Sequence, residues 1–193
     1  EEAIISHRLM GDFIPSEKSY KLLIDKKINP SELNYKPYPF LLANTFEKKI
    51  IDKSIKDFQF EWKWDGIRIQ LIKRSGKVSI WTRGQDLVNK SFPELVRKIS
   101  SIKDDFVVDG ELLVWDFNEN LPLNFSLLQK RINRKTPSVS IQKSLPIIFI
   151  AYDLLELNGE DQRESYLEIR RRNLENHLLK WLDESKEKLS NIF

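Results

Sequence analysis

The alternation of hydrophobic and polar residues changes phase at Gly66. Before this glycine every second residue is aromatic, at Phe58, Phe60, Trp62 and Trp64. After it the apolar positions are Ile67, Ile69 and Leu71. Alternation with a period of two is typical of a β-strand, and a phase change at an Asp-Gly pair indicates a turn or a bulge. We therefore predict strands over residues 58–64 and 67–73.

The same alternation predicts three later strands, over residues 77–82, 106–114 and 146–156. Tight turns are predicted at Ser75-Gly76 and at Asn158-Gly159, because such pairs favour hairpin connections. These turns would join neighbouring strands in an antiparallel arrangement.

Helical periodicity is found in three later segments. The first follows the capping-box sequence Ser91-Phe92-Pro93-Glu94, and the third follows a second capping box made of Ser165 and Glu168. Between them a helix begins near Phe125 and continues into the basic residues 130–135. Strands mixed with helices in this order indicate an α+β domain with an antiparallel sheet.

The N-terminal part of the chain has a different pattern. Residues 1–30 are predicted to be mostly helical, and three prolines between residues 30 and 39 indicate a linker. The chain begins with Glu1, and its only methionine is Met10. We therefore expect it to be a piece of a longer protein.

Composition limits the class of protein. Hydrophobic residues make up 40% of the 193 residues, which is typical of a globular chain, and the net charge of +3 is too small to argue for nucleic-acid binding by itself. Without cysteine, the chain can form neither a disulfide framework nor a Cys-based zinc site. There is no apolar run of membrane-spanning length and no signal peptide, so we expect a cytoplasmic protein without a membrane partner.

Lys63 is the first candidate for chemistry, because it lies between two tryptophans in the predicted strand 58–64. Lysine is rare in buried strands, so this one either extends to solvent or serves as a reactive amine. Burial lowers the pKa of an ammonium group and makes its nucleophilic form accessible near neutral pH. The alternation places Glu61, Asp65 and Arg68 on the polar side as well, and together they would line one cleft.

The run Lys63-Trp64-Asp65-Gly66 resembles the K-x-D-G signature of nucleotidyltransferases, in the form seen in ATP-dependent DNA ligases. A chance match with an exposed lysine is the alternative. Asp109-Gly110-Glu111 resembles the D-G-E motif of the same family, and the alternative there is a hairpin turn with a solvated acid.

Two further segments resemble motifs of this family. Tyr152, within residues 147–155, takes the place of the aromatic that stacks on adenine, although a core tyrosine in a buried strand would look the same. Thr82-Arg83-Gly84 resembles the S/T-R motif, although it could be a surface strand end. Four segments in the family's order are hard to assign to chance, and the flanking residues 36–40 and 125–132 also look similar.

The chain is thus similar to bacterial ATP-dependent DNA ligases that carry an N-terminal DNA-binding domain. The resemblance implies an antiparallel-sheet nucleotidyltransferase fold, the ATP-grasp-like adenylylation domain of ligases, incomplete at its C-terminus. Residues 1–34 would be the tail of the DNA-binding domain with the linker, and residues 35–193 the N-terminal part of the adenylylation domain. The family's later metal- and phosphate-binding strands would lie beyond residue 193, so we expect the piece alone to be inactive.

The resemblance also implies a reaction. In the family, a lysine attacks the α-phosphorus of ATP, and the AMP then passes to a 5′-phosphate at a nick. ATP and Mg²⁺ would be the cofactors and nicked double-stranded DNA the partner, in DNA repair, replication or recombination. Lys63 would be the catalytic residue. The other implied contacts are Glu61 with the adenine amino group, Arg68 and Arg83 with ribose or phosphate, Glu111 with ribose and metal, and Tyr152 with the face of the base.

Two other functions stay open. An RNA-capping-type guanylyltransferase shares K-x-D-G, although Glu61 and the flanking segments disfavour it. A non-catalytic nucleotide- or nucleic-acid-binding module is the second, and the intact Lys63 argues against it. The basic residues 130–135 and 170–172 are either solvated helix faces or contacts to DNA phosphates.

Overall fold

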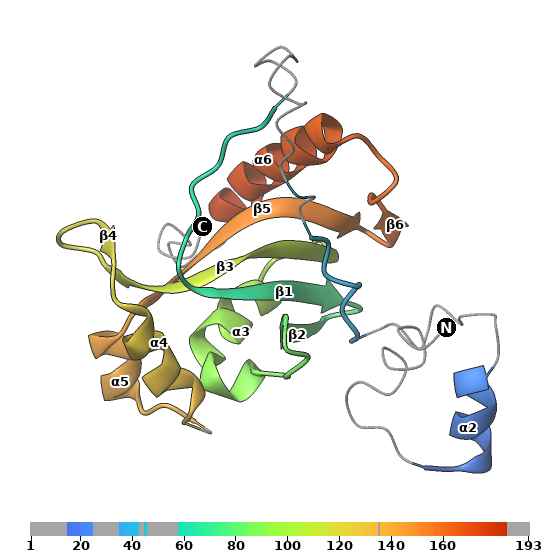
Figure 1. Ribbon diagram of the computed structural model, residues 1–193, viewed down its shortest axis with the longest axis horizontal. Helices are drawn as coiled ribbons and strands as arrows, with labels where there is room; N and C mark the ends of the chain where they lie inside the picture. Colours follow the sequence, from blue (N-terminus) through green and yellow to red (C-terminus); the bar gives the residue numbers. More distant parts are fainter. Residues whose placement is uncertain (1–14, 25–34, 43–44, 46–57, 135, 185–193) are drawn as a thin grey trace.

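The computed structural model describes residues 15–24, 35–42, 45, 58–134 and 136–184 (Figure 1). The elements in chain order are α2 (Glu17–Ile24), β1 (Ile67–Arg74), β2 (Lys77–Thr82), the 3₁₀ helix η4 (Asn89–Ser91), α3 (Pro93–Ser100), β3 (Phe106–Asp116), β4 (Leu121–Pro122), α4 (Phe125–Ile132), α5 (Val139–Ser144), β5 (Ile147–Leu157), β6 (Glu160–Asp161) and α6 (Leu167–Glu184). The helical segment predicted at the N-terminus is represented by α2, and the rest of residues 1–34 lies outside the described residues.

The strands form one antiparallel sheet in the order β2-β1-β3-β5-β6, with β4 paired to β3. The α+β fold with an antiparallel sheet is therefore confirmed, and β1, β2, β3 and β5 correspond to four of the predicted strands. Both predicted turns are present. Their central residues have positive φ, 50° and 74° at Ser75-Gly76 and 49° and 85° at Asn158-Gly159, as tight hairpin turns require.

The strand predicted over residues 58–64 is wrong. Residues 58–65 contain no strand, and β1 begins only after Gly66. Phe60 is 75% exposed and Trp62 is 84% exposed. Alternation shows only that a segment suits a half-buried strand. No described strand pairs with residues 58–65, so these residues form no strand. Trp64 instead lies edge-on to Trp115, with 6.0 Å between the ring centres.

Helices α3, α4 and α6 pack on one face of the sheet. Ile69 and Leu71 of β1 join a core cluster that includes Leu95 of α3, Leu128 of α4 and Leu174 of α6. In Figure 1, α6 lies along β5, while α3, α4 and α5 group on the other side of the view. Because side chains alternate along a strand, the opposite face carries Arg68, Gln70 and Arg74 of β1, together with a small apolar cluster around Ile72. We call this opposite face the polar face; it is defined by Arg68, Gln70, Arg74, Asp109 and Glu111.

The capping box predicted at Ser91 is also wrong. Helix α3 begins at Pro93, with Phe92 in the N-cap position and no side-chain cap. Proline is favoured at the first helical position, which fixes this start. The Ser91 hydroxyl instead donates to the carbonyls of Ile132 and Arg134, each at 3.3 Å. These bonds tie η4 to the end of α4.

Asp104, in the loop that leads into β3, connects α6 to the sheet. Its carboxylate accepts hydrogen bonds from Trp181 Nε1 at 2.8 Å and Lys180 Nζ at 2.9 Å. A third donor is the Asn158 side chain at 3.5 Å. Burial raises the pKa of Asp104, but these hydrogen bonds outweigh burial and the pKa lies below its usual value. The charged carboxylate therefore stabilises the docked helix.

We predict that Asp104→Asn lowers the free energy of unfolding at neutral pH by about 1–2 kcal/mol. The folded-state pKa is lowered, so the contribution is present above the unfolded pKa and is lost as the pH falls through the folded pKa. In urea unfolding, the difference in the free energy of unfolding between wild type and variant should decrease below about pH 4. Glu119→Gln, at an exposed position, is the matched control. A difference that stays constant into strong acid would contradict this role.

Candidate functional site

Arg68, Asp109 and Tyr152 meet on the polar face. Arg68 of β1 and Asp109 of β3 form a bidentate ion pair, with Nε to Oδ1 at 3.1 Å and Nη2 to Oδ2 at 2.7 Å. Asp109 is 1% exposed. Burial raises the pKa of Asp109 above its usual value. The Arg68 guanidinium and a hydrogen bond from the Tyr152 hydroxyl counteract part of this rise. A buried carboxylate needs such partners to stay charged.

A β-bulge sets the position of Tyr152. In the pairing of β3 with β5, Gly110 lies opposite Ala151 and Asp109 lies opposite Asp153, so Tyr152 is the extra residue between them. Bulges redirect side chains next to functional sites. Here Tyr152 reaches Asp109 on the polar face, while Asp153 pairs with Arg170 of α6 at 2.8 Å.

Glu111 lies directly across from Arg68 in the sheet register. Its carboxylate accepts a hydrogen bond from the Gly66 N–H at 3.2 Å. Burial raises the pKa of Glu111, and the Gly66 N–H and the charges of Arg68 and Lys63 counteract the rise. Lys63 is therefore close enough to act on Glu111 electrostatically, although it belongs to a separate segment.

The desolvation considered for the Lys63 amine is not found in the structure. Lys63 is exposed, as is Glu61, because the segment before β1 joins no strand in the described part of the chain. Glu61 lies 3.5 Å from Arg171 of α6, measured from Oε1 to Nη1. Of the four residues expected to line one cleft, only Arg68 is part of the polar face, whereas Glu61, Lys63 and Asp65 are exposed, and Glu61 is directed to α6.

A pocket of about 930 Å³ lies where β1 begins and β2 ends. It brings together three of the predicted site residues, Arg68, Arg83 and Glu111. The Arg83 N–H donates to the Arg68 carbonyl at 3.0 Å, which holds the residue after β2 against β1. The volume is in the range of small-molecule sites, roughly 300–1,000 Å³.

The pocket also contains residues that the sequence did not indicate. These are Lys90 and Ser91 of η4 and Asn133 after α4, and the predicted residues Glu61, Lys63 and Tyr152 do not line it. Single polar residues of this kind carry no periodic or motif signal, and only the packing of η4 against α4 brings them together. The D-G-E motif contains Asp109, but the spacing of residues along the chain does not predict that Asp109 pairs with Arg68.

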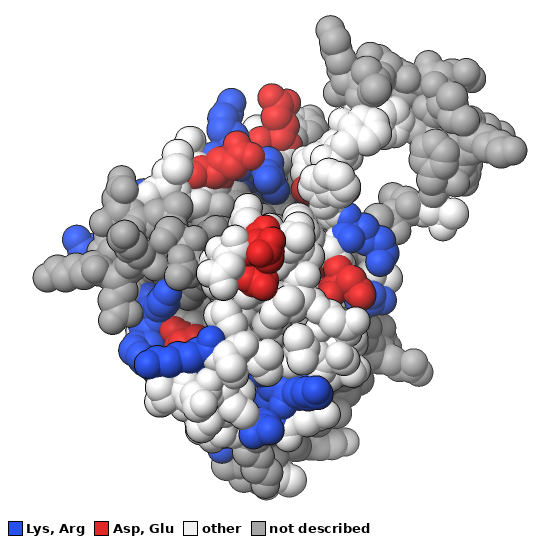
Figure 2. All heavy atoms as spheres, turned by 90° about the vertical axis from the view of Figure 1, so that its left-hand side faces the viewer, with Lys and Arg blue, Asp and Glu red and all other residues white. Residues whose placement is uncertain are grey.

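The basic runs are partly structural. Arg131 is completely buried, and it pairs with Glu94 and donates to the Leu145 carbonyl at 2.8 Å. Arg170 and Arg171 pair with acids on β5 and α6. On the face shown in Figure 2, basic and acidic side chains are interspersed. The described residues on this face therefore form no continuous positive stripe.

In the part of the chain that the structure describes, no group of three or more His, Cys, Asp or Glu side chains is arranged to hold a metal ion. None of the helices there has both the length and the hydrophobicity needed to cross a bilayer.

Comparison with known proteins finds DNA ligases among the matches. The family described as "ATP dependent DNA ligase domain" matches residues 40–191. The chain is 35% identical to a probable DNA ligase of Koribacter versatilis over 129 residues, covering 65% of this chain and 22% of that protein. It is 33% identical to a DNA ligase of Sulfophobococcus zilligii over 153 residues, covering 78% and 25%.

The chain spans about a quarter of the length of these curated relatives. Among solved structures, the ligase domain of M. tuberculosis LigD is 28% identical, with a TM-score of 0.49, and the match covers 62% of this chain and 36% of that chain.

Gly66 is required by the close approach of the chain before β1 to strand β3. A Cβ atom at this position would collide with the Leu112 carbonyl oxygen of β3 and press on Glu111. We predict that Gly66→Ala lowers the free energy of unfolding by about 1–3 kcal/mol, the usual range for overpacking. The matched variant Gly84→Ala, where the nearest atom would lie at 3.4 Å, should change it little. Urea unfolding measures both, and equal stabilities would contradict the packing argument.

Proposed function

Because this chain belongs to the family of ATP-dependent DNA ligase domains, we propose that it is part of an enzyme that seals nicks in double-stranded DNA through a lysyl-AMP intermediate. One observation carries the proposal: Arg68, Arg83 and Glu111, which the sequence motifs had selected, line one pocket, and the charge of Lys63 in the K-x-D-G run acts on Glu111. In this proposal, residues 1–34 belong to a DNA-binding domain and its linker, and residues 35–193 to the adenylylation domain. The enzyme would act in the cytoplasm, on nicks left by repair, replication or recombination.

Arg68 and Arg83 are proposed to hold the ribose or phosphates of ATP. A guanidinium presents several donors in a planar fork that matches phosphate oxygens. Asp109 engages Nε and Nη2 of Arg68 and so fixes the direction of the remaining nitrogen. The Tyr152 ring, 5.6 Å from the same guanidinium, is proposed to supply an aromatic surface for adenine.

Lys63 is proposed as the nucleophile. After its ammonium group loses a proton, Nζ attacks the α-phosphorus of ATP, a P–N bond forms, and the bond to pyrophosphate breaks with the electron pair leaving on pyrophosphate. The AMP then passes from Lys63 to the 5′-phosphate of a nick. Attack by the adjacent 3′-hydroxyl forms the phosphodiester and releases AMP.

Glu111 is the proposed protein ligand for Mg²⁺. Magnesium is usually held by one or two carboxylates together with substrate phosphates, so a pocket-lining carboxylate such as Glu111 fits this ion. When bound, Mg²⁺ would neutralise negative charge on the phosphates. Glu111 would also accept a hydrogen bond from the ribose, and the Gly66 N–H keeps its carboxylate in place.

For the nucleophile, we predict that Lys63→Arg abolishes covalent labelling of the full-length protein by ATP carrying label at the α-phosphate. A guanidinium stays protonated at neutral pH and cannot attack phosphorus. Because Lys63 is exposed, thermal melting should not change. Lys90→Arg, at a lysine that lines the pocket, is the control and should keep its label. Covalent label retained by the Lys63 variant would rule out this assignment.

Glu61 is proposed to recognise the adenine amino group. We predict that Glu61→Ala slows adenylylation by about tenfold or more, as expected for one lost hydrogen bond to a charged group, with little change in melting. Arg171→Ala removes the ion pair but keeps Glu61, and it should adenylylate at nearly the wild-type rate. If adenylylation is slowed to the same extent in both variants, Glu61 acts through its ion pair with α6 and not through the adenine base.

A further inference from the structure

The segment before residue 41 is fastened to the polar face through its backbone. Gln70 of β1 is fully buried, and its side-chain amide pairs with both backbone groups of Tyr38, accepting from N–H at 2.8 Å and donating to the carbonyl at 3.0 Å. The Trp81 Nε1 donates to the Tyr35 carbonyl at 2.6 Å. These hydrogen bonds fix the position and direction of residues 35–38 where the chain crosses the sheet.

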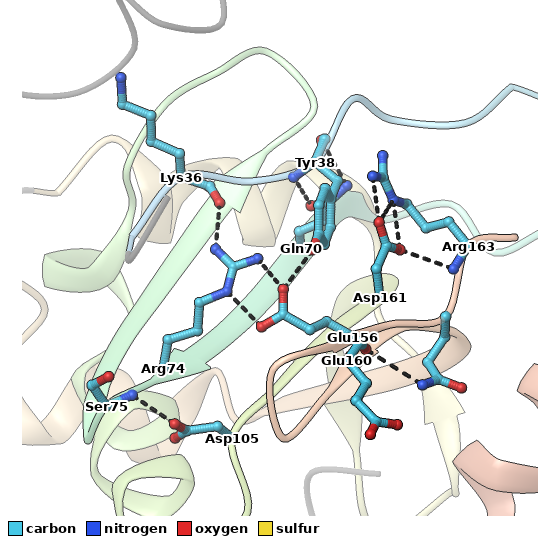
Figure 3. Close-up of polar contacts among 11 residues, drawn as sticks. Lys36, Tyr38, Gln70, Arg74, Ser75, Asp105, Glu156, Glu160, Asp161 and Arg163 are labelled. Atoms are coloured by element: carbon cyan, nitrogen blue, oxygen red, sulfur yellow. Dashed lines mark hydrogen bonds and ion pairs between the residues drawn. The ribbon is translucent and has the colours of Figure 1, made fainter. Parts of the chain in front are cut away.

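The Tyr38 side chain provides a second anchor (Figure 3). Its hydroxyl donates to Glu156 at 2.5 Å, and Glu156 forms a bidentate pair with Arg74 at 2.8 and 2.6 Å. The guanidinium carbons of Arg163 and Arg74 lie 4.0 and 5.2 Å from the centre of the Tyr38 ring. Burial raises the pKa of Tyr38 and Glu156 acts in the same direction, so the hydroxyl remains a donor.

Phe40 is carried by this anchored segment to the guanidinium of Arg68. The Phe40 ring centre lies 5.5 Å from the guanidinium carbon. The exposed neighbours Leu41 and Leu42 show that the segment turns its apolar side chains outward again after this contact. Arg68 is thus held by Asp109 at its nitrogens and by two rings, Phe40 and Tyr152, within cation–π range.

We propose that Phe40 is a positioning residue for the nucleotide site, with Tyr38 as its anchor. Phe40 acts through Arg68: its ring restricts the guanidinium to the direction in which it meets the nucleotide. The assignment rests on the proposed function, because only there does Arg68 contact ATP. An aromatic face is required for this role, since a ring attracts a cation and an aliphatic side chain of similar size does not.

The test compares Phe40→Leu with Phe40→Tyr in the full-length protein. Leucine keeps an apolar side chain but removes the aromatic face, whereas tyrosine keeps the face. We expect Phe40→Leu to raise the KM for ATP in self-adenylylation by about fivefold, as the loss of one cation–π contact implies. Phe40→Tyr and the exposed control Leu42→Ala should match wild type, and melting temperatures should stay close together.

Two further measurements separate this proposal from the proposed function. Tyr38→Phe removes the hydrogen bond to Glu156 and should raise the KM for ATP by about twofold. The NMR signal of the Arg68 Nε–H reports the guanidinium without any reaction, and its exchange with water should be faster in Phe40→Leu than in wild type or Phe40→Tyr. If no protein is labelled but this signal changes, the proposed function fails, while the restriction of the Arg68 guanidinium by Phe40 stands. If the Leu and Tyr variants agree in KM and in exchange, the positioning role is wrong.

Discussion

The ion pair between Arg68 and Asp109 is the constraint around which the polar face is organised. Asp109 is almost fully buried on the face of the sheet opposite the main hydrophobic core. A buried charge that loses its partner costs about 3–5 kcal/mol, so Arg68 has to remain at this position in the fold. The bulge that redirects Tyr152 and the segment that carries Phe40 both place groups around this same pair.

Strand β1 connects the start of the described domain to the candidate site. Its polar-face residues each bind something different: Arg68 binds Asp109, Gln70 binds the Tyr38 backbone, and Arg74 binds Glu156. Its other face contributes Ile69 and Leu71 to the core beneath the helices. One strand therefore couples core packing, the docked N-terminal segment and the orientation of the arginine in the pocket.

Local sequence signals predicted the central sheet, since alternation identifies β1, β2, β3 and β5 and the Asn-Gly and Ser-Gly pairs identify turns. Motif resemblance also selected Arg68, Arg83 and Glu111, which the structure brings to one pocket. The strand over 58–64 was wrong because alternation cannot show whether a neighbouring strand is available.

Non-local contacts explain the other differences. Arg131 looked like part of a solvated basic run, and its burial depends on Glu94 and Leu145 in other elements. The Ser91 hydroxyl bonds to α4 for the same reason. The contact of Phe40 with Arg68 joins residues whose spacing in the chain has no periodic meaning.

Mapping the site of AMP attachment tests the central claim most directly. The full-length protein would be incubated with ATP and Mg²⁺, digested under conditions that preserve the P–N bond, and analysed by tandem mass spectrometry. We predict AMP on the peptide that contains Lys63 and on no other lysine. AMP on Lys90, which lines the pocket itself, would show that the pocket is the nucleotide site but that Lys63 is not the nucleophile. The absence of any AMP-bearing peptide would contradict the lysyl-AMP mechanism.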